Sequence, residues 1–406
     1  MSSVPTRTLE HLRRPHSAGP GVEVFAVDDT SVQIIWSDAG VGPMTFRIDG
    51  RRVEHHLDGG PGAIVIEELT PDARLDLTVT TPTGSQLRRR VRTLAPPAGR
   101  ELFRFATIND VHLGHGHKEY GLPQVLRSVA QTDDDRHEAP RSDDLHDEPG
   151  TRDHQFDNAR AAIDEALEWG AQHLVVKGDL CDQGYDWIWD QAALLLGGLS
   201  IPVSILPGNH DTGALRRMEP EVGGGERGLH VTRGVDHLDV AGLRLVLVDS
   251  TTPGNGWGRV ARHADQAATA VHEAEGGVFL ATHHHPQRFR VPLFWPHGIP
   301  GPDADHFAGT IAAANPNVLA SSGHTHRCRR RVVGGLSWSE VAATSHFPGV
   351  WAGYVVHEGG IRQTVRRIGT PEALAWTEHT RHMFRGVWAL WSTGELSDRC
   401  FTIDWI

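Results

Sequence analysis

The sequence predicts two folded units, a small all-β sandwich followed by a larger α/β layered domain. Short alternating apolar runs separated by turn residues fill residues 21–94. From Leu102 onward, apolar runs of strand length alternate with helical patterns. Five short segments rich in metal-ligand side chains follow strands of this second unit. A chain of 406 residues is long enough for two or three domains with a sizeable core.

The composition is that of an ordinary soluble globular protein. No run of about 18 apolar residues is present to span a bilayer, and residues 1–20, expected to be a flexible tail, lack the apolar stretch of a secretory signal. The three widely spaced cysteines suit free thiols in a reducing compartment. A net charge of -12 disfavours nonspecific binding to nucleic acid. We therefore expect a cytoplasmic protein without a nucleic-acid or membrane partner.

The N-terminal unit is expected to span residues 21–97. Its strand-length runs lie at 22–27, 31–36, 44–48, 63–67, 75–80 and 86–92. The run 31–36, which ends in a tryptophan, and the later Leu69-Thr70-Pro71 resemble a fibronectin type III domain. Leu75 stands where that family usually has its corner tyrosine. Residues 94–99, with two prolines, predict a short linker, and we find no catalytic constellation in this unit.

The α/β unit is expected to span residues 98–370. Strand-length apolar runs lie at 103–108, 174–176, 203–206, 243–248, 278–281 and 318–320, with further strands expected at 331–333, 336–341 and 354–356. Residues 156–167 repeat apolar side chains at three- and four-residue spacing, which predicts an amphipathic helix. A rigid sheet fixes loops drawn from distant parts of the chain. We therefore expect the functional site at the strand ends.

Two further segments are expected to shape a binding pocket. Residues 131–154 are rich in Asp, Arg, His and Pro and are expected to form a loop insertion, with a lid over the site as the alternative. Residues 371–406 form a Trp-rich C-terminal extension that is too apolar to be disordered. We expect it to pack on the core or on a neighbouring subunit, which leaves a homo-oligomer open.

Five motifs carry hard metal ligands in one order along the chain. They are Asp110-Val111-His112, Gly178-Asp179-Leu180-Cys181-Asp182, Gly208-Asn209-His210-Asp211, His283-His284-His285-Pro286 and Gly323-His324-Thr325-His326. Each taken singly is weak evidence, because a strand-end turn or a polar loop explains it equally well. Their order and the strand before each make the signal strong. Oxygen and imidazole ligands suit manganese, iron or zinc better than calcium or a thiolate-bound structural zinc.

Over residues 102–368, the motifs resemble those of the calcineurin-like metallophosphoesterase family. Within the family, they are most similar to the bacterial class III cyclic nucleotide phosphodiesterases and the related glycerophosphodiesterases. The resemblance implies a four-layer α/β/β/α sandwich and hydrolysis of a small phosphate ester by a metal-bridging hydroxide. Phosphodiesters and phosphomonoesters both remain open as substrates. Two residues, His112 and Asp182, differ from the pattern of the purple acid phosphatase branch, which has a metal-binding tyrosine at the second position.

The resemblance also implies a role for each motif residue. The first metal would be held by Asp110, His112 and His326, and the second by Asn209, His324 and one histidine of the cluster, with Asp179 bridging both. The position relative to Pro286 selects His284, and the triple histidine leaves His283 as a competing choice. His210 would face the substrate phosphate and protonate or stabilise the leaving oxygen. Asp211 would be its hydrogen-bond partner.

A physical argument supports two of these roles independently. Two divalent ions about 3.5 to 4 Å apart clamp a phosphoryl group and lower the pKa of a bridging water. A carboxylate must lie between such like charges, and Asp179 is the natural candidate. The leaving alkoxide needs a proton donor that titrates near pH 7, which fits a histidine such as His210.

Other interpretations compete with an enzymatic site. Arg327, Arg329, Arg330 and Arg331 would suit a second phosphate or a polyanion, but a solvated edge strand with protective charges is the preferred interpretation. His115 and His117 are expected to be exposed in a Gly-rich loop. The alternative function is a catalytically weak scaffold or binding protein that recognises a partner through the β-sandwich. The complete ligand set favours the enzyme.

Overall fold

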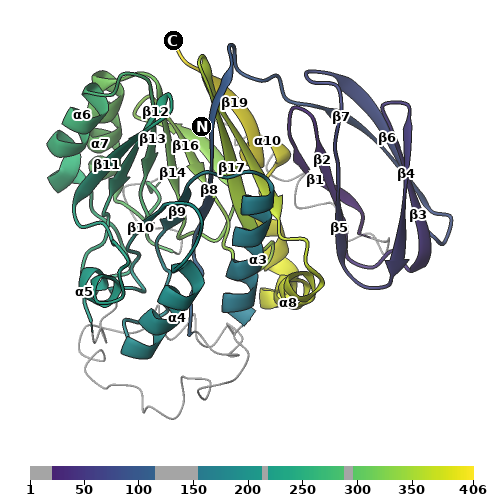
Figure 1. Ribbon diagram of the computed structural model, residues 1–406, viewed down its shortest axis with the longest axis horizontal. Helices are drawn as coiled ribbons and strands as arrows, with labels where there is room; N and C mark the ends of the chain where they lie inside the picture. Colours follow the sequence, from purple (N-terminus) through teal and green to yellow (C-terminus); the bar gives the residue numbers. More distant parts are fainter. Residues whose placement is uncertain (1–20, 115–153, 213–217, 288–295) are drawn as a thin grey trace, which may run out of the picture.

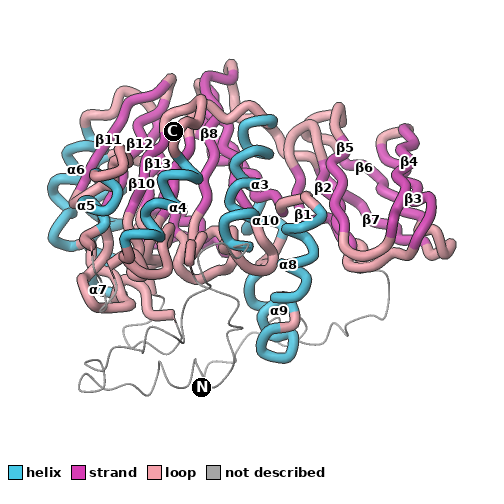
Figure 2. The backbone as a smooth tube through the Cα atoms, turned by 60° about the horizontal axis from the view of Figure 1, so that its bottom comes forward, coloured by secondary structure: helices cyan, strands magenta, loops and turns pink. Residues whose placement is uncertain are grey.

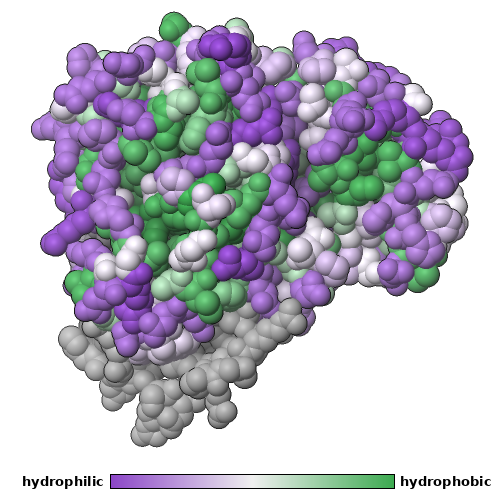
Figure 3. All heavy atoms as spheres, viewed as in Figure 1, coloured by the Kyte–Doolittle hydropathy of each residue, from purple (hydrophilic) through white to green (hydrophobic). Residues whose placement is uncertain are grey.

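The computed structural model describes residues 21–114, 154–212, 218–287 and 296–406. These residues form a β-sandwich joined to a larger four-layer α/β/β/α domain (Figure 1). In the space-filling view the sandwich is a lobe at the side of the larger body (Figure 3). The expected tail at 1–20 and, apart from His154, the expected insert at 131–154 lie outside the described residues.

Two antiparallel sheets form the N-terminal sandwich. One contains β1 (Glu23–Val27), β2 (Val32–Trp36) and β5 (Gly62–Ile66), and the other contains β3 (Val41–Ile48), β4 (Arg51–Asp58), β6 (Arg74–Thr80) and β7 (Gln86–Arg92). Trp36 is buried in the core between them, and its ring lies against Gly62, where a Cβ would stand only 2.0 Å away. The expected β-sandwich is confirmed. β4 was not predicted, because most of its side chains are polar and exposed.

Two six-stranded sheets form the middle layers of the larger domain. The first contains β8 (Glu101–Ile108), β9 (Leu174–Lys177), β10 (Val203–Leu206), β17 (Val350–His357), β18 (Gly360–Arg367) and β19 (Cys400–Asp404). The second contains β11 (Val235–Val240), β12 (Leu243–Val248), β13 (Gly277–Ala281), β14 (Val318–Ser322), β15 (Arg329–Val333) and β16 (Leu336–Glu340). Phe105, Phe279 and Tyr354 pack between the sheets with ring centroids 4.7 to 4.9 Å apart.

Helices cover the outer faces of both sheets (Figure 1). The first sheet is covered by α3 (His154–Glu168) and α4 (Asp186–Leu196), and the second by α6 (Ala264–His272) and α7 (Gly301–Ala314); α5 (Pro220–Gly225) and η4 (Ala261–His263) are short. The four-layer sandwich and the helix at 156–167 are thus confirmed. Among the helices of the described ranges, none combines the length and apolar character needed to cross a membrane.

The C-terminal extension is built into the larger domain. It contains α8 (Pro371–Arg381), η5 (Met383–Gly386), α9 (Val387–Ser392) and α10 (Leu396–Arg399), and α8 and α9 lie beside the strand ends (Figure 2). Its last strand, β19, pairs antiparallel with β18 and completes the first sheet. Trp405 then lies against Gly277 of the second sheet, where a Cβ would be 2.3 Å from its ring. Of the two expectations for this segment, packing on the core is therefore the one that the structure shows.

The sandwich is attached to the first sheet through buried charges on β18. Every residue of this strand is buried, although its sequence is largely polar. Arg366 donates to Asp28 Oδ2 at 2.7 Å. Arg362 Nε lies 2.6 Å from Asp28 Oδ1 and forms an ion pair with it, but the angles are not those of a hydrogen bond. The side-chain amide of Gln33 donates to the carbonyl oxygen of Arg367 and accepts from its N–H. Opposite charges and paired polar groups therefore join the two units.

Candidate metal centre

The five motifs meet at one edge of the two central sheets. β8, β9 and β10 are parallel neighbours in the first sheet, and β13 and β14 are parallel neighbours in the second. Parallel strands end at the same edge, so the loops that follow them converge. These side chains form four overlapping groups of three, and within each group the ligand atoms lie within 4.8 Å of one another. The expected placement of the motifs at strand ends is what the structure shows.

Several of the predicted ligands have a strained backbone. A positive φ between 50° and 69° is found at Asp110, His112, Asp179, His324 and His326. Residues with a side chain seldom adopt this conformation, and each instance costs on the order of 1 kcal/mol or more. Two motif glycines allow neighbouring motif loops to pack closely against the carboxylates. A Cβ on Gly208 would lie 2.1 Å from Asp179 Oδ1, and one on Gly323 would lie 2.6 Å from Asp110 Oδ2. Such strain is typical of functional sites.

Asp110, His112 and His326 form the first group of ligand atoms. His326 Nε2 lies 3.2 Å from Asp110 Oδ1 and 3.2 Å from His112 Nε2. The other ring nitrogen of His112, Nδ1, lies 3.2 Å from a carboxylate oxygen of Asp182 and is placed to donate to it. His112 Nε2 then carries a lone pair that faces the second imidazole and the carboxylate. A cation between these atoms would satisfy all three.

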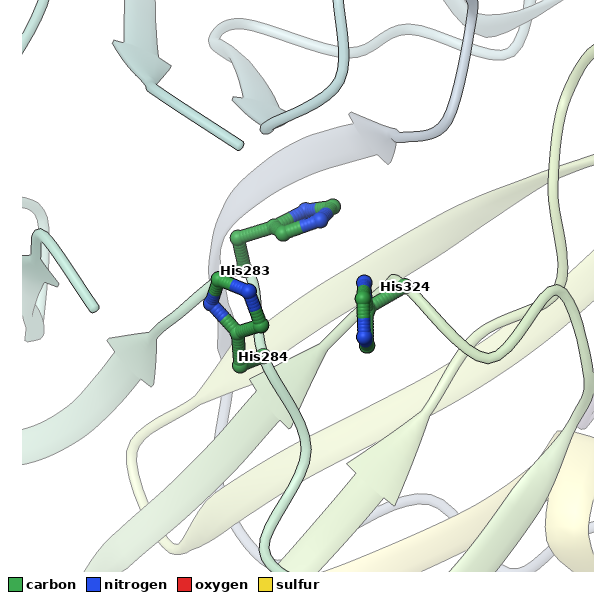
Figure 4. Close-up of side chains that lie close together, drawn as sticks. All are labelled: His283, His284 and His324. Atoms are coloured by element: carbon green, nitrogen blue, oxygen red, sulfur yellow. The ribbon is translucent and has the colours of Figure 1, made fainter. Parts of the chain in front are cut away.

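His283 and His324 form the core of a second group, together with His284 (Figure 4). His283 Nδ1 lies 2.9 Å from the carbonyl oxygen of Lys177, which can only accept, so Nε2 carries the lone pair when the ring is neutral. That Nε2 atom is 3.3 Å from Asp179 Oδ2 and 3.2 Å from Asn209 Oδ1. His324 Nε2 is likewise 3.1 Å from the carbonyl oxygen of His297, which leaves Nδ1 free to bind a metal.

The two competing histidines have different surroundings. His283 is the ring beside Asp179 and Asn209. The Nδ1 atom of His284 instead lies 2.9 Å from the hydroxyl of Ser250, and its Nε2 is buried without a hydrogen-bond partner among the described residues. The rings leave the same loop and gather with His324 (Figure 4). Both lie against His324 and can therefore reach one ion, but among these two rings His283 is the one that also lies beside Asp179 and Asn209.

Asp179 occupies the middle of the centre. It belongs to one group with Asp110 and His283 and to another with His112 and His210. Burial favours its neutral acid, but the nearby imidazoles, His283 first, outweigh burial and lower its pKa well below the usual value. The same balance, with His326 as the main partner, lowers the pKa of Asp110. Ionised carboxylates are the form that a metal binds.

The imidazoles divide by protonation state. Burial lowers the pKa of His112 to about 4 and that of His324 to about 3, so both rings are neutral at pH 7. Burial has the same tendency at His283, but the charge of Asp179 outweighs it and raises the pKa to about 9. In the absence of a metal, His283 therefore takes up a proton that stands in for the missing positive charge. Metal binding would release it.

His210 is the exposed member of the site. Burial opposes its charged form, but Asp179 and a 2.9 Å contact between His210 Nδ1 and Asp182 Oδ1 outweigh that and raise its pKa to about 10. Its side chain is 36 % exposed, so solvent screens part of this attraction. Asp182, and not the predicted Asp211, is thus the carboxylate that contacts His210. Asp211 instead accepts the backbone N–H groups of Leu180, Cys181 and Gly208.

Some residues of the site were not predicted. Asp182 contacts both His112 and His210, and its place inside the second motif was an available signal. Lys177 is fully buried and donates to Ser321 Oγ and the carbonyl oxygen of Ser322, and burial lowers its pKa to about 7. Neither Lys177 nor Ser250 belongs to a motif, so only the fold reveals them. His115 and His117 lie outside the described residues.

Comparison with known proteins identifies the family. A family model described as calcineurin-like phosphoesterase matches residues 103–328, which contain all five motifs. The chain belongs to this family. Its members are phosphoesterases with a binuclear divalent metal centre, and the side chains described above fit one in number, chemistry and unsatisfied lone pairs. No curated protein matches the chain.

Several solved structures are distantly similar. The purple acid phosphatase PPD1 from yellow lupin (Lupinus luteus) seeds is 12 % identical with a TM-score of 0.41, and the similarity covers 86 % of this chain and 73 % of that one. PhoD is 9 % identical over 88 % and 89 % of the chains, with a TM-score of 0.40. A putative 5'-nucleotidase from Staphylococcus aureus is 10 % identical over 69 % and 57 %, with a TM-score of 0.41. These likenesses are too distant to bear on substrate.

Proposed function

We propose that this phosphoesterase hydrolyses small phosphodiesters in the cytoplasm with two divalent ions of manganese, iron or zinc. The observation that carries the proposal is the convergence of lone pairs from Asp110, Asp179, His112 and His283 in a buried space. Without a metal, these acceptors repel one another, and a proton on His283 offsets only part of that repulsion. Two cations turn that repulsion into coordination, which explains why the chain holds these groups together.

The positions support a specific ligand set. We assign Asp110, His112 and His326 to the first ion, Asn209, His283 and His324 to the second, and Asp179 to both. His283 replaces the predicted His284 in this assignment because it lies beside both Asp179 and Asn209. His284 would pack beside His283, with its Nδ1 atom and its backbone N–H both hydrogen-bonded to the Ser250 hydroxyl.

The residues around the ions have separate tasks. When bound, the metals supply Lewis-acid activation of the phosphoryl group and of the attacking water. Asp182 holds Nδ1 of His210 at 2.9 Å, which leaves the Nε2 edge of that ring for the substrate. His210, partly exposed and protonated, then donates a proton to the leaving oxygen. The same Asp182 oxygen orients His112, so one carboxylate sets both the metal ligand and the proton donor.

The phosphodiester preference rests on the likeness of the motifs to cyclic nucleotide phosphodiesterases and glycerophosphodiesterases. These are the first substrates to test, with phosphomonoesters as the comparison. The scaffold alternative is less well supported, because all seven predicted metal ligands and His210 lie in the described part of the chain and converge.

The proposal is tested by measuring hydrolysis after the metal has been removed from the protein and after it has been added back. We would remove metal with a chelator, add back manganese, iron or zinc, and measure turnover of cyclic nucleotides, glycerophosphodiesters, nucleotides and sugar phosphates. Activity that returns with one of these metals at two ions per chain, and is highest on a diester, is the expected result. Turnover that survives stripping would contradict a metal-dependent mechanism. A monoester preferred over every diester would contradict only the substrate class.

A further inference from the structure

A group of arginines lies beside the metal centre and has too few counter-charges. Arg329 and Arg331 of β15 stand opposite Glu340 and Trp338 of β16, and their side chains share one face of the sheet. Arg329 Nε donates to Glu340 Oε1 at 2.9 Å, Arg331 Nε lies 3.3 Å from the same oxygen, and Arg327 Nε lies 3.9 Å from Oε2. Three guanidinium groups therefore share one carboxylate.

These arginines are not a solvated edge, contrary to the preferred interpretation of the sequence. The side chains of Arg327, Arg329 and Arg331 are 14 %, 26 % and 17 % exposed, and Glu340 is completely buried. Arg331 Nε and Nη2 are buried and make no hydrogen bond within the described residues. Burial, reinforced by the repulsion of Arg329 and Arg327, lowers the pKa of Arg331 to about 10 against the opposing effect of Glu340. Only Arg330 is exposed, on the opposite face.

The cluster adjoins the second metal position. Glu340 pairs in register with Ser322, the last residue of β14, and His324 follows in the next turn. The ring of His285 stacks on that of His324, with centroids 5.8 Å apart. His285 is 7 % exposed, and its Nδ1 atom is buried without a hydrogen-bond partner within the described residues. Unused nitrogens of Arg331 and His285 thus lie near a predicted metal ligand, and the charges of all three arginines reach the His285 ring.

We propose that Arg327, Arg329 and Arg331, with His285, form a subsite for a second phosphate group of the substrate. The inference rests on the proposed function, because it takes the first phosphate to be the one hydrolysed at the metals. Three guanidinium charges less that of Glu340 leave two positive charges, which Asp398 near Arg327 offsets only in part. A terminal phosphate, with a charge of about -2 at pH 7, can neutralise this excess in full. A carboxylate would neutralise only half of that excess. Guanidinium groups bind phosphate oxygens through paired N–H donors.

A matched series of substrates tests the subsite. We would use p-nitrophenyl phosphodiesters whose second arm is an alkyl chain of increasing length, ending either in a phosphate or in a hydroxyl group. Both versions release the same nitrophenolate, so kcat/KM compares the arm alone. The metal-loaded full-length enzyme would be measured as wild type, Arg331→Gln and Arg330→Gln. Arg330 is the matched control, because it lies on the same strand and carries the same charge but points to the ring of Phe401.

We expect the wild type to prefer a phosphate-ended arm of suitable length by about tenfold to a hundredfold. Arg331→Gln should lose most of that preference with kcat/KM on the hydroxyl series retained, and Arg330→Gln should keep it. If Arg331→Gln does not fold, Arg331→Lys, which keeps the charge and loses the paired donors, should lose part of the preference. Hydrolysis without preference at any length, or a preference untouched by the Arg331 variants, would overturn the subsite. Absence of hydrolysis throughout would overturn the proposed function itself and the subsite with it.

Discussion

The metal centre and the interface between the sandwich and β18 both bury several ionisable side chains, but with opposite arrangements. At the interface, Asp28 lies between Arg362 and Arg366, so opposite charges face each other. At the centre, the oxygens of Asp110 and Asp179 face imidazole nitrogens whose other edges are already occupied. The first arrangement is complete without a ligand. The second becomes complete only when cations are present.

The difference separates residues kept for stability from residues kept for function. A buried charge with its partner in place is strongly destabilising to break, because the remaining charge stays buried. At the centre, protons on His283 and His210 attract Asp179 while Asp110 repels it, so the metal-free arrangement is only partly compensated until cations bind. Loss of one acceptor should therefore cost the metal-free chain less stability than loss of a paired interface charge, while it removes activity. The predictions below test this contrast.

Asp179→Ala should have the largest effect, on activity. It removes the carboxylate shared by both ions, and we expect kcat/KM on an activated aryl phosphodiester to fall by more than about a thousandfold. Bound metal, measured by elemental analysis, should fall with it. The free energy of unfolding of the metal-free protein should fall by less than in Asp28→Ala, because Asp179 is repelled by Asp110 as well as attracted by the protonated His283 and His210.

The control for this variant is Asp186→Ala, an acid of α4 with a side chain 76 % exposed, which should retain both activity and metal. An Asp179→Ala protein that is fully active after metal removal would contradict the assigned bridge. A large loss of stability in the metal-free state would contradict the contrast with the interface.

Asp28→Ala, at the interface, should lower stability and leave activity unchanged. Arg366 would lose its carboxylate partner and Arg362 would keep only Asp29, so we expect the free energy of unfolding at neutral pH to fall by about 3 kcal/mol. Activity measured below the unfolding transition should remain. Asp76→Ala is the matched control, because its pair with Arg90 is 3.4 Å long and highly exposed, and breaking it should cost less than about 1 kcal/mol. Equal losses from the two variants would show that the interface charges contribute no more than a surface pair.

The contrast also explains what the sequence did and did not predict. Buried strands that are short apolar runs, such as β9 and β13, were predicted. β18 was missed because its buried side chains are charged and find partners on another unit, which no local pattern reveals. β11 and β19 were missed as well; β11 has exposed polar positions, and β19 is an edge strand.

At the site, residue types were predictable and pairings were not. Each metal-ligand side chain follows a strand, so the motifs indicated the right neighbourhood for all of them. The choice between His283 and His284, or between Asp182 and Asp211, depends on the direction in which each side chain leaves its loop. In the fold, Asp211 turns toward backbone N–H groups and Asp182 toward two imidazoles. Sequence spacing contains no information on that direction.

The two histidines of the cluster can be compared directly. His283→Ala should reduce kcat/KM by more than about a hundredfold and lower the metal content to near one ion per chain, because its Nε2 lies beside Asp179 and Asn209. His284→Ala should cost less, about tenfold to a hundredfold, with both ions retained. Elemental analysis and kinetics on the same preparations decide. The reverse order would restore His284 as the ligand.

Asp182→Asn tests whether one carboxylate positions two imidazoles. The amide keeps the shape but loses the charge that faces both rings, and we expect a loss of about tenfold to a hundredfold in kcat/KM. The loss should be larger on an alkyl leaving group than on nitrophenolate, because only the former needs a proton from His210. Asp211→Asn, which faces backbone N–H groups, should lower stability instead. Equal losses on both leaving groups would limit Asp182 to its contact with His112.

His173 offers the smallest effect and a third arrangement, a buried ionisable group whose partner is a neutral hydroxyl. Its Nε2 lies 2.9 Å from Ser204 Oγ, and burial lowers its pKa in the folded chain. The unfolded chain therefore takes up this proton first as the pH falls, near the ordinary value of about 6.5. Stability should be complete above that pH and decline as the pH falls further, toward the folded pKa. Denaturation across this range should show a weaker decline for His173→Gln than for wild type, whereas Ser204→Ala, which leaves the ring buried, should keep the decline. An unchanged pH dependence in His173→Gln would mean that burial without a counter-charge has no cost at this position.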